Sequence, residues 1–144
     1  MFSLQAFSSL FMVALLGTVG HAQNTTCTRQ YTVQSGDFCD GISAAQNVST
    51  FQLAHVNAAT INPICTNLFA GETLCLGIAG QDCDTVHVVA SGDNCEAIAA
   101  TAGTDFATLV ANNPNVDAGC TNIYPGEVLC TATELIPYNT TSSS

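Results

Sequence analysis

The sequence predicts an α+β protein made of two tandem copies of one small unit, each running strand, helix, helix, strand. A stretch at Tyr31–Cys39 recurs at His87–Cys95, with Ser-Gly-Asp at the same place in both copies. The eight cysteines form two sets of four, with successive spacings of 12, 26 and 10 residues and then of 12, 25 and 10. Agreement at this level indicates an internal duplication.

The first copy begins with the alternating, β-branched run Tyr31-Thr-Val33, which is typical of a strand. Gly36 can take a positive φ, which predicts a turn, and Asp37 is expected to cap the helix that follows. Thr50 is the expected cap of the second helix. The predicted elements are a strand at 31–33, a turn at 35–37, helices at 39–46 and 51–57, and a returning strand at 72–76.

The second copy follows the same order, and Gly103 is expected to end its first helix while Thr104 caps its second. The predicted elements are a strand at 86–89, a turn at 91–93, helices at 95–102 and 105–112, and a returning strand at 127–130. The second copy is one residue shorter than the first, and we place this difference in the connection between the two helices. Ala58-Ala59 then aligns with Asn113-Pro114.

The chain divides into five predicted segments. Residues 1–22 hold a short apolar run followed by Gly20-His-Ala22, which is typical of a signal peptide, although no Lys or Arg precedes the run. Secretion is therefore expected, with no transmembrane segment or hydrophobic lipid-anchor signal in the remainder. The predicted boundaries are a signal peptide at 1–22, modules at 30–77 and 86–132, a linker at 78–85 and a polar tail at 133–144.

Cysteines in a small secreted chain predict a disulfide framework, which offsets the small core of units of this size. Metal binding is disfavoured because no CxxC pair is present and the three histidines have no ligand-like spacing. We expect pairing within each copy, and among the three possible pairings we favour first with third and second with fourth. The cysteines are Cys27, Cys39, Cys65, Cys75, Cys83, Cys95, Cys120 and Cys130.

A formal net charge of −10, with a single Lys or Arg, argues against binding to nucleic acid or to anionic membranes. A neutral ligand is compatible with this charge, and so is a cationic one. No cofactor is expected. Three N-x-S/T sequons predict glycosylation at Asn24, Asn47 and Asn139.

The repeated motifs resemble the LysM module. The openings are Tyr31-Thr-Val-Gln-Ser-Gly-Asp37 and His87-Val-Val-Ala-Ser-Gly-Asp93, and the closings are Asn67-Leu-Phe-Ala-Gly-Glu-Thr-Leu74 and Asn122-Ile-Tyr-Pro-Gly-Glu-Val-Leu129. The cysteine positions resemble the fungal version of the module. This resemblance implies a two-stranded antiparallel sheet with both helices on one face. It also implies a secreted effector that binds chitin or chitin oligosaccharides, either to withhold fragments from host receptors or to shield the fungal wall.

The resemblance also implies a groove between the loop after the first strand and the loop after the second helix. Apolar Ile61 or Val116 would pack on an N-acetyl methyl group, while loop backbone groups would bond its amide. Two grooves on one chain would also allow ligand-mediated self-association. The expected ligand-binding residues are Gly36, Asp37, Phe38, Ile61, Asn62, Gly92, Asp93, Asn94, Pro114, Asn115 and Val116.

Two departures from the family pattern affect these expectations. Phe38 and Asn94 stand where the family usually has threonine. The usual Asn-Pro after the second helix is intact as Asn113-Pro114 but aligns with Ala58-Ala59 in the first copy, because Asn62-Pro63 lies four residues further on. We therefore expect the second groove to bind better than the first. Two other hypotheses remain: a structural wall or host-interaction protein with degenerate grooves, and a chitin hydrolase, which is disfavoured because most of the acids serve turns and caps.

Overall fold

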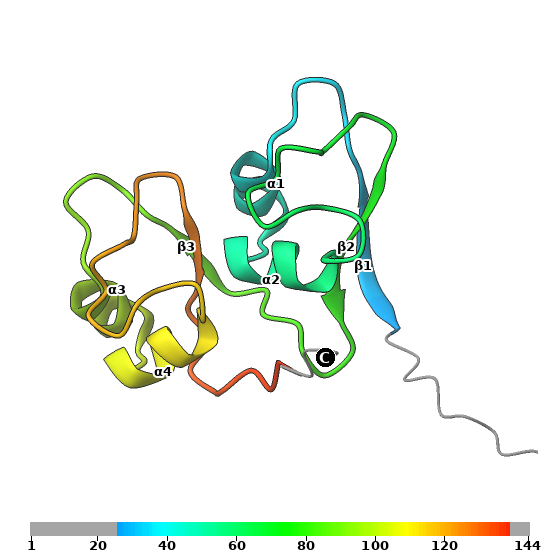
Figure 1. Cartoon of the computed structure of the whole chain (residues 1–144). Helices are drawn as coiled ribbons and strands as arrows, with labels where there is room; N and C mark the ends of the chain where they lie inside the picture. The colour runs from blue at the N-terminus through cyan, green and yellow to red at the C-terminus, as the bar shows by residue number, and fades with distance from the viewer. Residues whose placement is uncertain (1–25, 139–144) are drawn as a thin grey trace, which may run out of the picture.

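The computed structural model describes residues 26–138 as two βααβ modules (Figure 1). Both first helices begin and end where the sequence predicts, and the other elements differ from their predicted ranges by a few residues. The first module comprises β1 (Cys27–Thr32), α1 (Cys39–Gln46), α2 (Thr50–Val56) and β2 (Thr73–Ile78), and the second comprises β3 (Val86–Val88), α3 (Cys95–Ala102), α4 (Phe106–Asn112) and β4 (Val128–Cys130). The predicted α+β class is confirmed.

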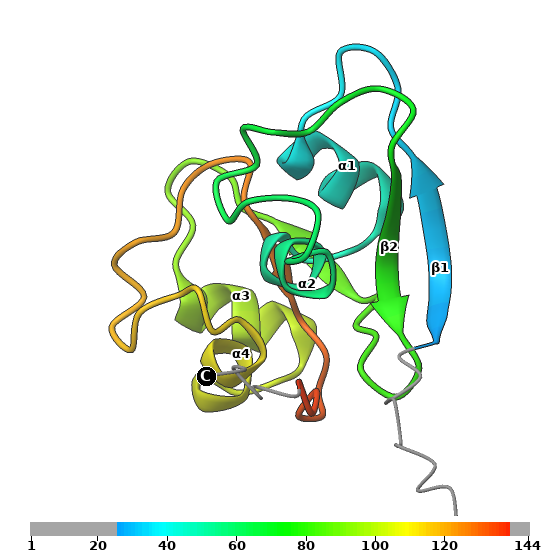
Figure 2. The same cartoon turned by 45° about the vertical axis from the view of Figure 1, so that its right-hand side comes forward.

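Each module contains a two-stranded antiparallel sheet with helices packed against it. Strand β1 pairs with β2 and places Tyr31 opposite Leu74, and β3 pairs with β4 and places His87 opposite Leu129. Helices α1 and α2 cover one face of the first sheet (Figure 2). The buried side chains of the two cores are Val33, Ile42, Val48, Leu53, Ile61, Leu74 and Leu76, and then Val89, Cys95, Ile98, Ala99, Leu109, Val116 and Leu129.

All eight cysteines are paired within their own module, as expected, but the favoured pairing is wrong. The bridges join first with fourth and second with third: Cys27–Cys75, Cys39–Cys65, Cys83–Cys130 and Cys95–Cys120. The reason lies in the sheet, because antiparallel pairing brings the first cysteine on β1 beside the last cysteine on β2, with their Cα atoms 5.8 Å apart. The two inner cysteines instead join the start of a first helix to the loop that returns to the sheet.

The helix caps also differ from the predictions. Asp37 and Asp93 lie before the N-cap positions, and Thr50 is already the first residue of α2. Thr104 precedes the cap of α4, and its hydroxyl is buried without a hydrogen-bond partner. The side chains that cap the second helices are Ser49, which accepts a hydrogen bond from the Gln52 N–H, and Asp105, which accepts one from the Thr108 N–H.

These caps relocate the length difference between the modules. Asn47 and Gly103 both end a first helix in the left-handed conformation, and in each case the second-helix cap follows two residues later. The connection between the helices therefore has the same length in both modules. The predicted alignment of Ala58-Ala59 with Asn113-Pro114 is wrong, because the extra residue of the first module lies after its second helix.

The second module docks against the helices of the first. Strand β4 contacts both α1 and α2, and the Val128 N–H donates a hydrogen bond to the Thr50 hydroxyl at 3.0 Å. Further along the chain, Tyr138 packs edge-on against Phe51 and His55, which stack on each other. Helix α2 thus lies between its own sheet and the second module (Figure 2). The fold consequently fixes one module relative to the other.

Candidate functional site

The Ser-Gly-Asp turns that open each module are held by their own aspartates. Gly36 has a φ of 91°, in the region that favours glycine. The Asp37 carboxylate accepts hydrogen bonds from the Gln34 N–H at 2.7 Å and from the Tyr31 hydroxyl at 2.8 Å, both at Oδ2. The hydrogen bond to Asp37 also raises the pKa of the Tyr31 hydroxyl. The Asp37 side chain therefore shapes the turn from within.

The second module repeats this arrangement with histidine in place of tyrosine. Gly92 has a φ of 88°, and Asp93 accepts a hydrogen bond from the Ala90 N–H at 2.8 Å and lies 2.7 Å from His87 Nε2. The Ala90 N–H, and then His87, hold the pKa of the Asp93 carboxyl below its usual value. The turn has the same backbone in both modules, so the two loops start from the same geometry.

Phe38 and Asn94, which follow these turns, have the same backbone conformation but different roles. Both are N-caps, with φ and ψ of −139° and 156° at Phe38 and of −138° and 154° at Asn94. The Asn94 side chain accepts a hydrogen bond from the Ala97 N–H, whereas the Phe38 side chain makes no capping hydrogen bond and 66% of its surface is exposed. A large apolar side chain is thus placed in solvent where a capping residue would stabilise the helix.

The loop after the second helix is anchored by one asparagine in each module. The Asn57 amide donates to the carbonyls of Leu53 and Cys75 and accepts from the Cys75 N–H. Asn113 makes the matching three hydrogen bonds in the second module, to Leu109 and Cys130. The first module therefore keeps the asparagine of the family's Asn-Pro pair and lacks only the proline.

Further along this loop, polar side chains bond one another. Asn62 bonds the side chain and the N–H of Thr66, while its own N–H donates to Asn67. Asp117 occupies the corresponding place in the second module and bonds Thr121 and Asn122. Hydrogen bonds from Thr121 hold the pKa of the Asp117 carboxyl below its usual value. Asn62 thus stabilises the loop.

The two apolar residues predicted to contact a ligand belong to the module cores. Ile61 is 3% exposed and Val116 is 6% exposed. Ile61 also lines two surface cavities, whereas Val116 lines none of the three cavities considered within residues 26–138. Pro114 and Asn115 are exposed at the corresponding loop, and Asn115 donates a 2.6 Å hydrogen bond to Glu127.

A cavity of about 390 Å³ brings the two predicted loops of the first module together. Phe38 comes from the loop before α1, and Ile61, Pro63 and Ile64 come from the loop after α2. Its floor is formed by the helices and by the Cys39–Cys65 bridge, and one wall is Tyr124 of the second module. The remaining lining residues are Asp40, Thr50 and Ala54.

The matching cavity of the second module is smaller, at about 230 Å³. It has Asn94 where the first has Phe38, Phe106 where the first has Thr50, and Gly119 near the position of Ile64. Its other lining residues are Cys95, Glu96 and Cys120. The second cavity is therefore partly filled by its own phenylalanine and offers less apolar wall. Gly36, Asp37, Asn62, Gly92, Asp93, Pro114 and Val116 line none of these cavities.

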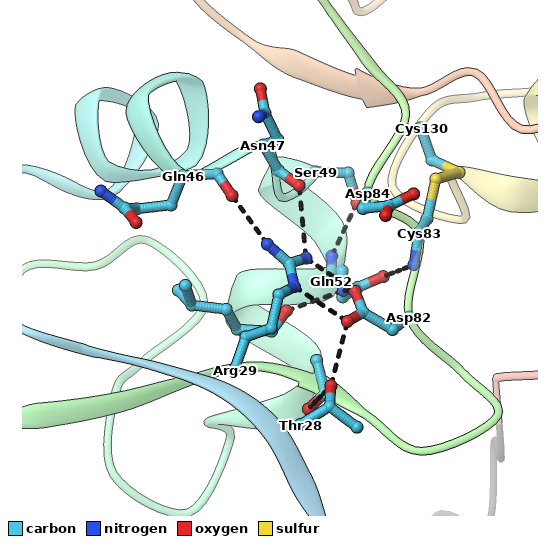
Figure 3. Close-up of polar contacts among 12 residues, drawn as sticks. Thr28, Arg29, Gln46, Asn47, Ser49, Gln52, Asp82, Cys83, Asp84 and Cys130 are labelled. Atoms are coloured by element: carbon cyan, nitrogen blue, oxygen red, sulfur yellow. Dashed lines mark hydrogen bonds and ion pairs between the residues drawn. A yellow bond between two sulfur atoms is a disulfide. The ribbon is translucent and has the colours of Figure 1, made fainter.

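A dense polar cluster between β1, the two helices of the first module and the linker is structural (Figure 3). Arg29 forms an ion pair with Asp82 at 2.7 Å and donates to the carbonyls of Gln46 and Asn47 at the end of α1. The fully buried Gln52 amide bonds the same carboxylate, as well as the Leu76 carbonyl and the Cys83 N–H. These contacts tie a strand and two helices to the linker, so the cluster's donors are used within the fold.

Asp40, Pro63, Ile64 and Tyr124 line the larger cavity and were not predicted from the sequence. Tyr124 reaches this cavity through the docking of the two modules, for which no local motif gives a signal, whereas the other three belong to the first module. Within residues 26–138, no group of His, Cys, Asp and Glu is arranged to hold a metal ion, and no helix is long and apolar enough to cross a bilayer. The predicted signal peptide and the sequons at Asn24 and Asn139 lie outside the described residues. Asn47 is exposed.

Comparison with known proteins agrees with this architecture. The family model for the LysM domain matches residues 31–77 and 87–131. The chain belongs to the LysM family. Each matched range covers one module, from its first strand to its last.

Relatives of these LysM modules are fungal. The chain is 33% identical over 115 residues to the non-secreted LysM effector LCP1 of Gibberella moniliformis, covering 78% of this chain and 15% of the relative. It is 32% identical over 126 residues to a secreted LysM effector of Pochonia chlamydosporia, covering 86% of this chain and 18% of that relative. It is 29% identical over 127 residues to the secreted LysM effector LysM1 of Trichophyton rubrum, covering 72% and 50%. The chain thus spans at most half the length of these relatives.

The names of these relatives describe LysM effectors, some secreted and some non-secreted. Among solved structures, the spore cortex-lytic enzyme SleL of Bacillus megaterium aligns with 70% of this chain and 21% of its own, at 18% identity and a TM-score of 0.34. That likeness is too low to bear on function.

Proposed function

We propose that the chain binds oligomers of N-acetylglucosamine, chitin above all, in the groove of its first LysM module. The cavity of about 390 Å³ between the two loops carries this proposal. Its volume is in the range of small-ligand sites, which combine apolar walls with a few placed polar groups. A sugar ring with an N-acetyl methyl group presents the matching surface.

Phe38 and Ile64 are the central contacts in this proposal. They are 66% and 77% exposed, and both line the cavity. The chain has no tryptophan, so Phe38 is the aromatic side chain with which the first module can cover the apolar face of a sugar ring in this cavity. Exposed apolar side chains beside a cavity support a binding role, because a ligand that covers them removes apolar surface from water.

We assign the stronger groove to the first module, although the sequence favours the second. Asn57 supplies the loop anchor that Asn113 supplies in the second module, which removes one reason for preferring the second. The larger cavity and the apolar Phe38 and Ile64 then favour the first. One way to compare the two grooves is to measure binding by the double variant Asp37→Ala with Ile61→Ala and by the double variant Asp93→Ala with Pro114→Ala. This comparison tests the grooves poorly, because Ile61 is a core residue and its loss would also destabilise the first module.

The biological role that fits this binding is that of a secreted effector. Withholding chitin fragments from host receptors, or covering the fungal wall, would require binding without cleavage. Among the described residues, Asp40 is the only carboxylate that lines the large cavity, whereas glycosidases of the common type use a pair of carboxylates. The secreted LysM effectors among the relatives support this role.

Binding is tested by retention on insoluble chitin against cellulose, followed by calorimetry with a chitin hexamer. We expect retention on chitin alone and measurable heat with the hexamer. Phe38→Ala with Ile64→Ser should weaken hexamer binding at least about ten-fold, which corresponds to about 1.4 kcal/mol. The matched control is Asn94→Ala with Gly119→Ser in the second module, and it should have a smaller effect.

The competing hypothesis is a structural protein with degenerate grooves. It predicts no heat with the hexamer while the circular dichroism spectrum stays that of a folded protein. Absence of retention on chitin by the folded, oxidised chain would overturn the proposed function. Release of new reducing ends that stops on changing one acid would instead establish the hydrolase hypothesis.

A further inference from the structure

The large cavity continues into a second one across the junction of the two modules. The second cavity, of about 400 Å³, shares five lining residues with the first: Thr50, Ala54, Ile61, Pro63 and Tyr124. Asn115 of the second module completes its wall, and Phe51, His55 and Ala58 complete its floor. We name this continuous surface the junction groove. The first module supplies its apolar side, and Tyr124 with Asn115 supplies the other side.

Asp40 gives the junction groove a negative charge that no lysine or arginine neutralises. Its two carboxylate oxygens accept hydrogen bonds from neutral hydroxyl groups, from Thr50 at 2.8 Å and from Tyr124 at 2.9 Å. A carboxylate has about four acceptor positions, so Asp40 can accept further hydrogen bonds from a ligand. The single Arg or Lys of the chain, Arg29, is already paired with Asp82.

A second acid, Glu127, lies behind the wall of the junction groove. Glu127 is 2% exposed, and its hydrogen bonds come from the Asn115 side chain and the Tyr124 N–H, both uncharged groups. Burial raises the pKa of the Glu127 carboxyl, and the negative charge of Asp40 adds to this rise. The charge that faces the groove is therefore that of Asp40, which attracts a positive group and repels an anionic sugar such as a uronic acid.

We propose that the junction groove binds partly deacetylated chitin, with the ammonium group of a glucosamine residue at Asp40 and an N-acetylated neighbour against Phe38 and Ile64. This inference rests on the proposed function, the binding of N-acetylglucosamine oligomers, and adds to it a preference for a free amine. An ammonium group offers three donors to a carboxylate, and such charge-assisted hydrogen bonds are stronger than neutral ones. The flanking hydroxyl groups of Thr50 and Tyr124 hold the Asp40 carboxylate at the groove.

The test compares hexamers by calorimetry on the full oxidised chain, in mildly acidic buffer where the sugar amine is protonated. One hexamer is fully acetylated and the other carries a single free amine. We expect the second to bind about five-fold more tightly, or roughly 1 kcal/mol, with a preference that shrinks as salt is added. Asp40→Asn should abolish this preference, so that the variant binds the two hexamers equally.

Two variants control for net charge and for folding. Glu134→Gln removes the same charge at an exposed position outside the groove and should retain the preference. Asp40→Glu keeps the carboxylate and should retain it at least in part. The inference is overturned if the wild-type chain binds both hexamers equally, or if the preference survives Asp40→Asn.

The outcomes separate the two proposals. Equal binding of both hexamers would refute the preference for a free amine and leave chitin binding intact. Binding of neither hexamer by the folded chain would refute both. An equal loss in Asp40→Asn and Glu134→Gln would assign the preference to net charge and refute the role of Asp40.

Discussion

The hydroxyl group of Tyr124 donates a 2.9 Å hydrogen bond to the carboxylate of Asp40, which lies 84 residues earlier in the chain. Desolvation of the tyrosine, followed by this hydrogen bond, raises the pKa of the hydroxyl, so Tyr124 remains a donor throughout the physiological range. Asp40 also accepts from Thr50, which in turn accepts from the Val128 N–H of β4. The same side chains that dock the modules therefore form the walls of the proposed groove.

Phe38→Asn should make the protein more stable and a weaker binder. The backbone at Phe38 matches that at Asn94, whose side chain caps α3, so an asparagine at position 38 can cap α1 in the same way. We expect a gain of about 0.5–2 kcal/mol in the free energy of unfolding from the cap. Hexamer binding should fall because the aromatic contact is lost. Urea unfolding and calorimetry measure the two effects, and lower stability with unchanged binding would contradict the prediction.

Gln52→Leu should destabilise the docked modules. The Gln52 amide is fully buried and bonds the Leu76 carbonyl, the Cys83 N–H and the Tyr138 hydroxyl. Leucine has a similar size but leaves these groups unpaired, and each unpaired buried group costs about 1–3 kcal/mol. We expect a loss of about 2–5 kcal/mol in urea unfolding. Gln46→Leu at the end of α1 is the control, and an equal loss in both variants would refute the role of Gln52.

Asp82→Asn should change how stability depends on pH. Hydrogen bonds from Arg29 lower the pKa of the Asp82 carboxyl in the folded chain below its unfolded value of about 3.9. The ionised pair consequently stabilises the fold above about pH 4, and that stabilisation is lost as the pH falls through the lowered folded pKa.

The variant should therefore be less stable than the wild type at neutral pH, and this gap in stability should close as the pH falls below about 4. Thermal unfolding across this range measures the gap. Asp84→Asn, at an exposed neighbouring position, should show only a small gap at every pH. A gap for Asp82→Asn that is independent of pH would rule out the ion pair as its source.

Non-reducing digestion followed by mass spectrometry should recover Cys27 linked to Cys75 and Cys39 linked to Cys65. Replacing both cysteines of the inner bridge with serine should lower the free energy of unfolding by about 2–4 kcal/mol, because the unfolded chain gains freedom. Replacing the corresponding pair, Cys95 and Cys120, should have a similar effect, since the two loops close 26 and 25 residues. A peptide that links Cys27 to Cys65 would disprove the observed pairing.

Local patterns were sufficient to predict the fold. Short-range geometry determines the turns at Gly36 and Gly92 and the first helix of each module, and single residues are enough to predict it. The disulfide pairing could not be predicted this way, because it depends on which strands are neighbours. Phe51 and Phe106 illustrate a second limit: both are aromatic residues near the start of a second helix, yet they differ by one position relative to their caps.

The candidate site was predicted only in part. The sequence pointed to the two loops, and Phe38 and Ile61 do line one cavity. Tyr124 could not be found from the repeat, because its place in the groove depends on the docking of the second module, whereas Asp40 has an acidic counterpart, Glu96, at the second cavity. A duplicated motif describes what the modules share, whereas the proposed groove arises from the place where they meet.

The bridges Cys27–Cys75 and Cys83–Cys130 close each module near its two ends, with sequence separations of 48 and 47 residues. Tension applied to the two ends of the described chain would run through the sulfur atoms and along the short segment from Cys75 to Cys83. Most of each module would stay outside the loaded path. Tension between the two ends of the described chain would therefore strain the docking surface between the modules and leave most of each module unloaded.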